Sequence, residues 1–90
     1  MTTVTSLHQS TNKRNEKTEE ALYEIGRNIR RFRVERGMTL KMLGAATGLS
    51  TSMLSLVERG LSSPSIGSLI TICSALGIQM SDLIVQDSQS

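Results

Sequence analysis

The side chains that could do chemistry in this sequence gather between residues 39 and 60, TLKMLGAATGLSTSMLSLVERG. This segment carries closely spaced hydroxyl groups and two positive charges, at Thr51, Ser52, Ser55, Lys41 and Arg59. Hydroxyl groups both donate and accept hydrogen bonds, and arginine binds anions through a planar fork of N–H donors. These residues indicate non-covalent recognition of a polar, negatively charged partner.

Catalysis is not indicated anywhere in the sequence. The chain has no paired nucleophile and base, no cluster of carboxylates and no phosphate-cradling glycine loop. Its single cysteine, Cys73, and single histidine, His8, complete neither a disulfide nor a zinc tetrahedron. We therefore predict that the protein is not an enzyme and has no metal or cofactor. Cys73 is expected to be a small buried hydrophobic residue, and His8 to have no function.

Positive charge is concentrated in one third of the chain. Residues 27–59 contain seven Lys or Arg residues against two Glu, a net charge of +5, whereas residues 1–26 carry −1 and residues 60–90 carry −2. Such a concentration attracts polyanions and speeds encounter with them. A solvated helix face would explain the same run of charge.

The elements that must position these residues are short helices. Apolar residues at helical spacing predict a first helix from an N-cap at Thr18 to about Arg36. Further caps predict helices that begin after Thr39, Ser50 and Pro64–Ser65, and a last turn from Ser81. The expected fold is all-α, a compact bundle of five short helices over residues 18–85. Residues 1–17 are expected to be a disordered tail, and residues 86–90 a polar tail or the start of a linker.

The connection between the second and third predicted helices decides the fold. Only a few residues around Gly48 join them, so the third predicted helix must turn sharply across the second instead of folding back along it. This is the geometry of a helix-turn-helix. One helix lies across the phosphate backbone while the next, here about residues 50–59, presents its first residues to the major groove.

With these motifs the sequence resembles the Xre/Cro-like helix-turn-helix family of bacterial and phage transcription regulators. The resemblance covers about residues 22–84 and rests on IGRNIRRFRVERGMTL, TGLSTSMLSLVERG and SSPSIGSLITICSALGIQMSDLI. It implies a lambda-repressor-like DNA-binding domain. The run ERGLSSPS, followed by a helix that ends in ALG, is similar to the branch in which this domain precedes a cupin barrel that senses small molecules. Such a cupin would follow residue 90, after the linker-like VQDSQS.

The family's contact positions carry over residue by residue. Its base-facing positions match Thr51, Ser52 and Leu56, with Ser55 beside them. None of these side chains forms a bidentate pair with a base, so we expect weak direct readout. Phosphate contacts are expected from the amide-rich helix starts, at Leu40 and Lys41 and at Thr51 and Ser52. The family adds the loop after the recognition helix, here with Arg59, Ser62 and Ser63.

The first helix holds further arginines. The family pairs an arginine late in this helix with a glutamate at the end of the recognition helix, which implies a structural ion pair between Arg33 and Glu58. The remaining arginines are expected on the solvent face, where they supply a long-range field and can make one or two phosphate contacts: Arg27, Arg30, Arg31 and Arg36. Two departures from the family are Leu40, where glutamine is common, and Gly44, where alanine is usual.

Together these features predict a sequence-specific double-stranded DNA-binding domain of a cytoplasmic transcription regulator, a repressor that acts as a homodimer. Apolar residues near the C-terminus either form the dimer seam or close the monomer's own core: Ile78, Met80, Leu83, Ile84 and Val85. Two alternatives stay open, a protein-interaction module whose first helix binds an acidic partner and an antitoxin. No apolar stretch reaches the roughly 20 residues of a membrane span. Any small-molecule effector would act through a domain outside these residues.

Overall fold

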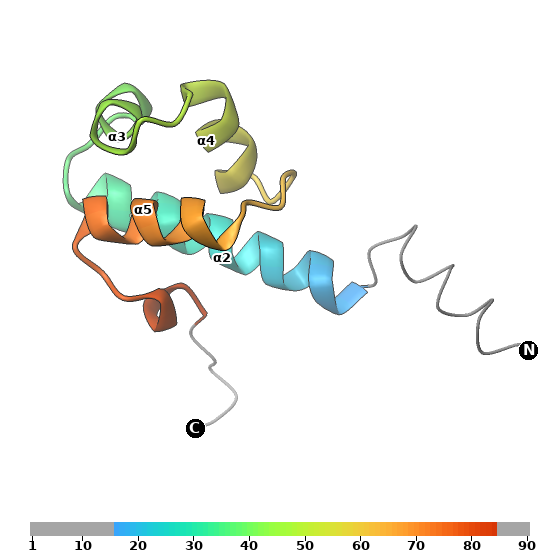
Figure 1. Cartoon of the computed structure of the whole chain (residues 1–90). Coiled ribbons are helices and arrows are strands. Elements are labelled where there is room, and N and C mark those ends of the chain that lie inside the picture. The colour runs from blue at the N-terminus through green and yellow to red at the C-terminus, as the bar shows by residue number, and fades with distance from the viewer. Residues whose placement is uncertain (1–15, 85–90) are drawn as a thin grey trace, which may run out of the picture.

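The computed structural model describes residues 16–84, which form four α-helices and one 3-10 helix (Figure 1). In chain order they are α2 (Glu16–Glu35), α3 (Leu40–Thr47), α4 (Thr51–Glu58), α5 (Ile66–Leu76) and η1 (Met80–Leu83). The described residues contain no strand, in agreement with the all-α prediction. The predicted last turn is a 3-10 helix, so residues 16–84 contain four α-helices where a bundle of five short helices was expected.

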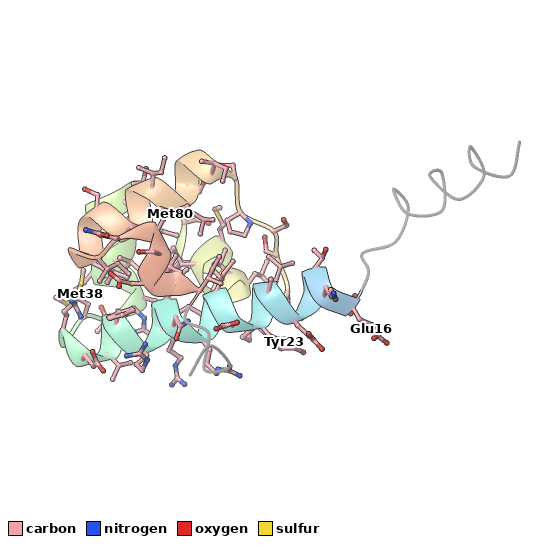
Figure 2. All side chains as sticks on the ribbon, turned by 90° about the horizontal axis from the view of Figure 1, so that it is seen from below. Glu16, Tyr23, Met38 and Met80 are labelled. Carbon is pink, nitrogen blue, oxygen red and sulfur yellow. The ribbon has the colours of Figure 1, made fainter. Side chains whose placement is uncertain are left out.

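The long helix α2 supports the other elements, and its first turns project past them (Figures 1 and 2). Its buried stripe contains Leu22, Gly26 and Ile29. The helix is already formed at Glu16, so Thr18 is not its N-cap and the last two residues of the predicted tail are helical. Acidic residues in this first turn interact favourably with the helix dipole. The rest of that tail, with His8, and residues 86–90 lie outside the described residues.

The starts of the three short α-helices follow the sequence signals. The side-chain oxygens of Thr39, Ser50 and Ser65 each accept a 3.0 Å hydrogen bond from the backbone N–H three residues further on. These bonds satisfy amide groups that a helix start leaves unpaired. The 3-10 helix starts one residue before the predicted Ser81, because the carboxylate of Asp82 accepts a 2.8 Å hydrogen bond from the backbone N–H of Gln79.

The core is aliphatic and joins all the elements. Its fully buried side chains are Ile29, Leu43, Leu54, Val57, Ile72 and Leu83. Cys73 is buried among them, and burial together with the charge of Asp82 raises the pKa of its thiol, so it packs as a small hydrophobic group.

The C-terminal apolar residues divide between core and surface. Leu83 is buried and Ile78 packs against the core, so these two close the monomer. The Nδ2 of Asn28 donates a 2.7 Å hydrogen bond to the carbonyl of Leu83, which ties η1 to α2. Met80 and Ile84 are exposed, and Val85 lies outside the described residues.

No single helix in residues 16–84 is both long enough and apolar enough to cross a membrane. Only α3 and α4 taken as a pair pass that test, and they are bent by 114° at their break.

Candidate nucleic-acid interface

The turn between α3 and α4 sets the orientation of the candidate site. The two helices meet at 114°, within the range of about 90–120° that a helix-turn-helix shows. Gly48 ends α3 with a φ of 78°, a left-handed conformation that side chains with a Cβ rarely adopt. Its N–H donates a 2.8 Å hydrogen bond to the carbonyl of Gly44. The predicted sharp crossing is therefore present, and α4 does not lie antiparallel to α3.

Gly44 has a structural role that its sequence position alone does not reveal. A Cβ at this residue would lie 2.9 Å from the carbonyl oxygen of Leu49 and 3.5 Å from the Thr51 methyl group. Glycine costs a helix about 1 kcal/mol relative to alanine. Here it allows the turn to pack directly on α3.

The predicted base-facing residues share one exposed surface. Thr51 and Ser52 are exposed at the start of α4, Leu56 is 39% exposed, and Ser55 is partly exposed. They line a shallow hollow, which we call the recognition hollow, together with Leu40 and Arg59. The opposite side of α4 is buried, and Met53 packs against the core instead of facing the hollow. The start of α4 is therefore open to a partner.

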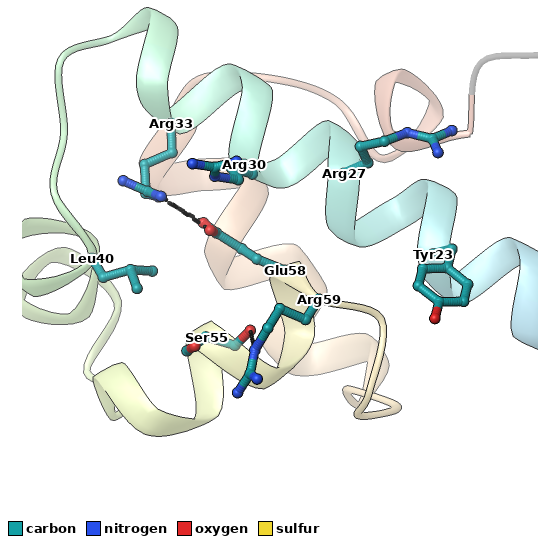
Figure 3. Close-up of a pocket in the computed structure, with 8 residues that line it drawn as sticks. All are labelled: Tyr23, Arg27, Arg30, Arg33, Leu40, Ser55, Glu58 and Arg59. Atoms are coloured by element: carbon teal, nitrogen blue, oxygen red, sulfur yellow. Dashed lines mark hydrogen bonds and ion pairs between the residues drawn. The ribbon is translucent and has the colours of Figure 1, made fainter.

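The predicted phosphate-contacting residues are more dispersed. Leu40 and Arg59 line the recognition hollow, whereas Lys41, Ser62 and Ser63 do not. Lys41 is exposed in the first turn of α3, and the two serines lie in the loop between α4 and α5. Arg59 is exposed at the C-terminal end of α4, where its Nε donates a 3.4 Å hydrogen bond to the carbonyl of Ser55. Its side chain thus lies beside Ser55, one of the predicted base-facing residues (Figure 3).

The expected ion pair between Arg33 and Glu58 is present and links α2 to the end of α4 (Figure 3). The Nε of Arg33 lies 2.6 Å from Oε2 of Glu58, and its Nη2 donates a 3.0 Å hydrogen bond to Oε1. The remaining Nη1 donates to the carbonyl of Met38 at 2.7 Å. The two side chains are 11% and 5% exposed, and the hydrogen bond to Glu58 raises the pKa of Arg33. The pair therefore orients α4 on α2.

The sequence itself decides the family of this domain. A profile of the HTH_3 helix-turn-helix family matches residues 29–83. The chain belongs to this family. The Xre/Cro-like assignment is thereby confirmed, whereas nothing in the match separates the cupin-associated branch from others.

The HTH_3 chain is similar to transcription regulators of bacteria and phages. It is 32% identical over 66 residues to the HTH-type transcriptional regulator y4dJ of Sinorhizobium fredii, covering 73% of this chain and 86% of that protein. It is 34% identical over 64 residues to the immunity repressor of Bacillus phage phi105, covering 71% of this chain and 44% of the repressor. The crystal structure of an HTH_3 family transcriptional regulator from Vibrio cholerae superposes with a TM-score of 0.73 at 33% identity, covering 80% and 40% of the two chains.

By name, the proteins from Sinorhizobium fredii and Vibrio cholerae are transcriptional regulators, and the phage protein is a repressor. The chain spans less than half of the phage repressor and of the Vibrio cholerae regulator. Within residues 16–84, no three histidine, cysteine or acidic side chains come together as a metal site would require.

In this HTH_3 domain the arginines of α2 fall into two groups that the sequence did not distinguish. Arg31 pairs with Glu35 at 3.5 Å, and the Nε of Arg36 donates a 2.6 Å hydrogen bond to the carbonyl of Leu76, at the end of α5. Arg36 therefore has a packing role beyond the predicted long-range field. Arg27 and Arg30 instead line an open groove of about 570 Å³ between α2 and α4, which we call the α2–α4 groove. Its lining residues are Tyr23, Arg27, Arg30, Arg33, Leu40, Ser55, Glu58 and Arg59 (Figure 3).

Proposed function

We propose that this chain is the sequence-specific double-stranded DNA-binding domain of a transcription regulator. The observation that carries the proposal is the exposed, hydroxyl-bearing start of α4, which stands at 114° to α3 and lines the recognition hollow. A major groove about 12 Å wide admits one α-helix. Helix α4 enters it with Thr51 and Ser52 leading, and Ser55 and Leu56 reach bases further along the groove.

Phosphates on either side of that groove are bound by backbone amides and cations. The starts of α3 and α4 offer unpaired N–H groups, at Leu40 and Lys41 and at Thr51 and Ser52. Arg59, with Ser62 and Ser63 in the following loop, supplies the contacts after α4. Such contacts fix the register of the protein on the duplex, while the hydroxyl groups read the sequence.

The relatives and the exposed apolar residues extend the proposal to the role and assembly of the regulator. A repressor role is supported by the similarity to the phage immunity repressor. A homodimer on two half-sites about one helical turn apart is favoured, because one domain with so few base-reading side chains would distinguish DNA sequences poorly. Met80 and Ile84 offer exposed apolar surface for such pairing. A cupin sensor after residue 90, its small-molecule effector and a cytoplasmic location follow from the family resemblance. The interaction-module and antitoxin interpretations are not favoured, because the relatives are transcription regulators.

The first prediction concerns the salt dependence of DNA binding. The chain is titrated with a duplex of selected sequence at about 50 mM and about 200 mM salt, and its affinity should be at least about 100-fold lower at the higher concentration. Each phosphate contact contributes about −0.9 to the slope of log affinity against log salt, so several contacts together give this loss. Fluorescence anisotropy measures both affinities. Absent or salt-insensitive binding would contradict the proposal and favour a protein partner.

The second prediction separates base readout from phosphate contacts. Thr51→Ala should change the difference in binding free energy between DNA sites that vary at one or two base positions by about 1 kcal/mol or more. The reason is that base contacts carry sequence information. Arg59→Ala should instead weaken binding to all sequences by a similar factor and lower the salt slope by about 1. Selection of binding sites from random oligonucleotides compares the two variants. An unchanged profile for Thr51→Ala, or loss on one operator alone for Arg59→Ala, would reverse these assignments.

A further inference from the structure

The α2–α4 groove is continuous with the recognition hollow. Both are lined by Leu40, Ser55 and Arg59, so the surface that carries the predicted base-facing residues extends without a break onto α2. Figure 3 shows Leu40 and Tyr23 at opposite ends of this groove, with arginine side chains from both helices between them. A polymer seated on the recognition hollow therefore has a path along α2.

The groove is positively charged because its one carboxylate is already engaged. Glu58 is held by two hydrogen bonds from Arg33. Within residues 16–84, Arg27, Arg30 and Arg59 have no carboxylate within ion-pair distance. Arg31 and Arg36 each pair with Glu35 and do not line this groove, although Arg31 shares a neighbouring hollow on α2 with Arg27 and Arg30. The groove lining thus contains three arginines without a carboxylate partner among the described residues, Arg27, Arg30 and Arg59.

We propose that the α2–α4 groove is a second phosphate track, which binds the sugar-phosphate backbone of the DNA strand that runs past the recognition helix. This inference rests on the proposed function and adds Arg27 and Arg30 to its contacts. The two residues are three apart on α2 and are neighbours on its surface, so they reach phosphates of one strand. Arg59 joins this track to the recognition hollow.

Tyr23 completes the far end of the track. The residue is 57% exposed, yet a Cβ on Gly60 would lie 2.9 Å from its ring and 3.0 Å from its Cα, so the loop after α4 packs tightly against it. Tyrosine hydroxyl groups are among the donors that bind DNA phosphates. A strand is favoured over a small anion or an acidic peptide, because the groove is open to solvent and shares Leu40, Ser55 and Arg59 with the helix-turn-helix recognition surface.

The test compares Arg30→Ala with Arg31→Ala on a selected operator duplex. Both variants remove one positive charge from neighbouring exposed positions of α2, so a purely long-range field effect is equal in the two. Arg30→Ala should lower affinity about 5- to 10-fold at 0.1 M salt and reduce the magnitude of the salt slope by about 0.9. Arg31→Ala should change affinity less than about twofold, as expected of a charge that is screened and makes no contact. Arg30→Lys should retain the slope, and Arg27→Ala/Arg30→Ala should lose about twice as much of it as Arg30→Ala.

Replacing single DNA phosphates by neutral methylphosphonate linkages tests whether the groove binds the DNA backbone. Placed singly along the strand that flanks the recognition helix, one or two of them should weaken binding of the unmodified chain but not of Arg27→Ala/Arg30→Ala. Circular dichroism melting confirms that the variants fold. The proposed phosphate track is wrong if Arg27→Ala/Arg30→Ala has the same affinity and salt slope as Arg31→Ala. It is also wrong if every methylphosphonate linkage weakens binding of Arg27→Ala/Arg30→Ala and of the unmodified chain equally. Failure of the unmodified chain to bind any duplex would instead overturn the proposed function.

Discussion

Replacing Gly26 by alanine is expected to destabilise the domain by about 3 kcal/mol, the upper end of what overpacking a well-packed interface costs. A Cβ at this position would overlap the carbonyl oxygen of Val57 and lie 2.7 Å from that of Glu58. Both obstacles are backbone atoms of α4, which cannot move aside as a flexible side chain does. Helix α4 would have to shift away from α2, against the better helix propensity of alanine, worth about 1 kcal/mol. Urea unfolding followed by circular dichroism measures the difference.

Gly67→Ala provides a matched control within the same chain. Gly67 lies in α5, and a Cβ there would meet only the hydroxyl oxygen of Ser65 at 3.9 Å. The same substitution should therefore stabilise this site by up to about 1 kcal/mol, because alanine restricts the unfolded chain and favours the helix. A Gly26→Ala stability within 0.5 kcal/mol (about the spread of surface substitutions) of the unmodified chain would show that α2 and α4 are not in such close contact.

Local features of this domain could be predicted from the sequence because their causes lie within a few residues. The caps at Thr39, Ser50 and Ser65 bond to amides three residues away. The crossing of α3 and α4 follows from a short connection in which Gly48, with a φ of 78°, redirects the chain. The boundaries were less accurate: Glu16 and Met80 both start helices earlier than predicted, because first turns fray and several nearby residues can cap them.

Contacts between distant segments could not be predicted in the same way. Arg36 bonds to Leu76, 40 residues away, and no local pattern indicates that partner. Nothing in the sequence distinguishes Gly26 from the other glycines, and only the structure shows that the backbone of α4 packs against it. The pairing of Arg33 with Glu58 came only from the family resemblance. The division of the arginines between groove and packing depends on where α4 and α5 lie against α2, because Arg30 and Arg31 are adjacent in sequence and only about 100° apart around the helix.

Arg33→Ala is expected to destabilise the domain by about 3–5 kcal/mol, since removal of one partner strands the other charge in the interior. The side chain of Glu58 is only 5% exposed, and the carbonyl of Met38 would also lose its donor. Arg30→Ala is the control one helical turn away. Arg30 is exposed and has no carboxylate partner among the described residues, so its removal should change stability by less than about 0.5 kcal/mol. Equal losses in thermal or urea unfolding would show that the pair does not hold α4.

A double variant separates the structural role of this pair from a role in binding. Arg33→Met/Glu58→Leu removes both charges and fills the space with apolar atoms, so most of the stability lost in Arg33→Ala should return. Because Arg33 also lines the α2–α4 groove, DNA binding by this variant is informative. If the pair only orients α4, the folded double variant should retain operator affinity within about threefold and an unchanged salt slope, as expected when no phosphate contact is lost. A slope smaller by about 1 would mean that Arg33, although bound to Glu58, also contacts a phosphate and is part of the track formed by Arg27 and Arg30.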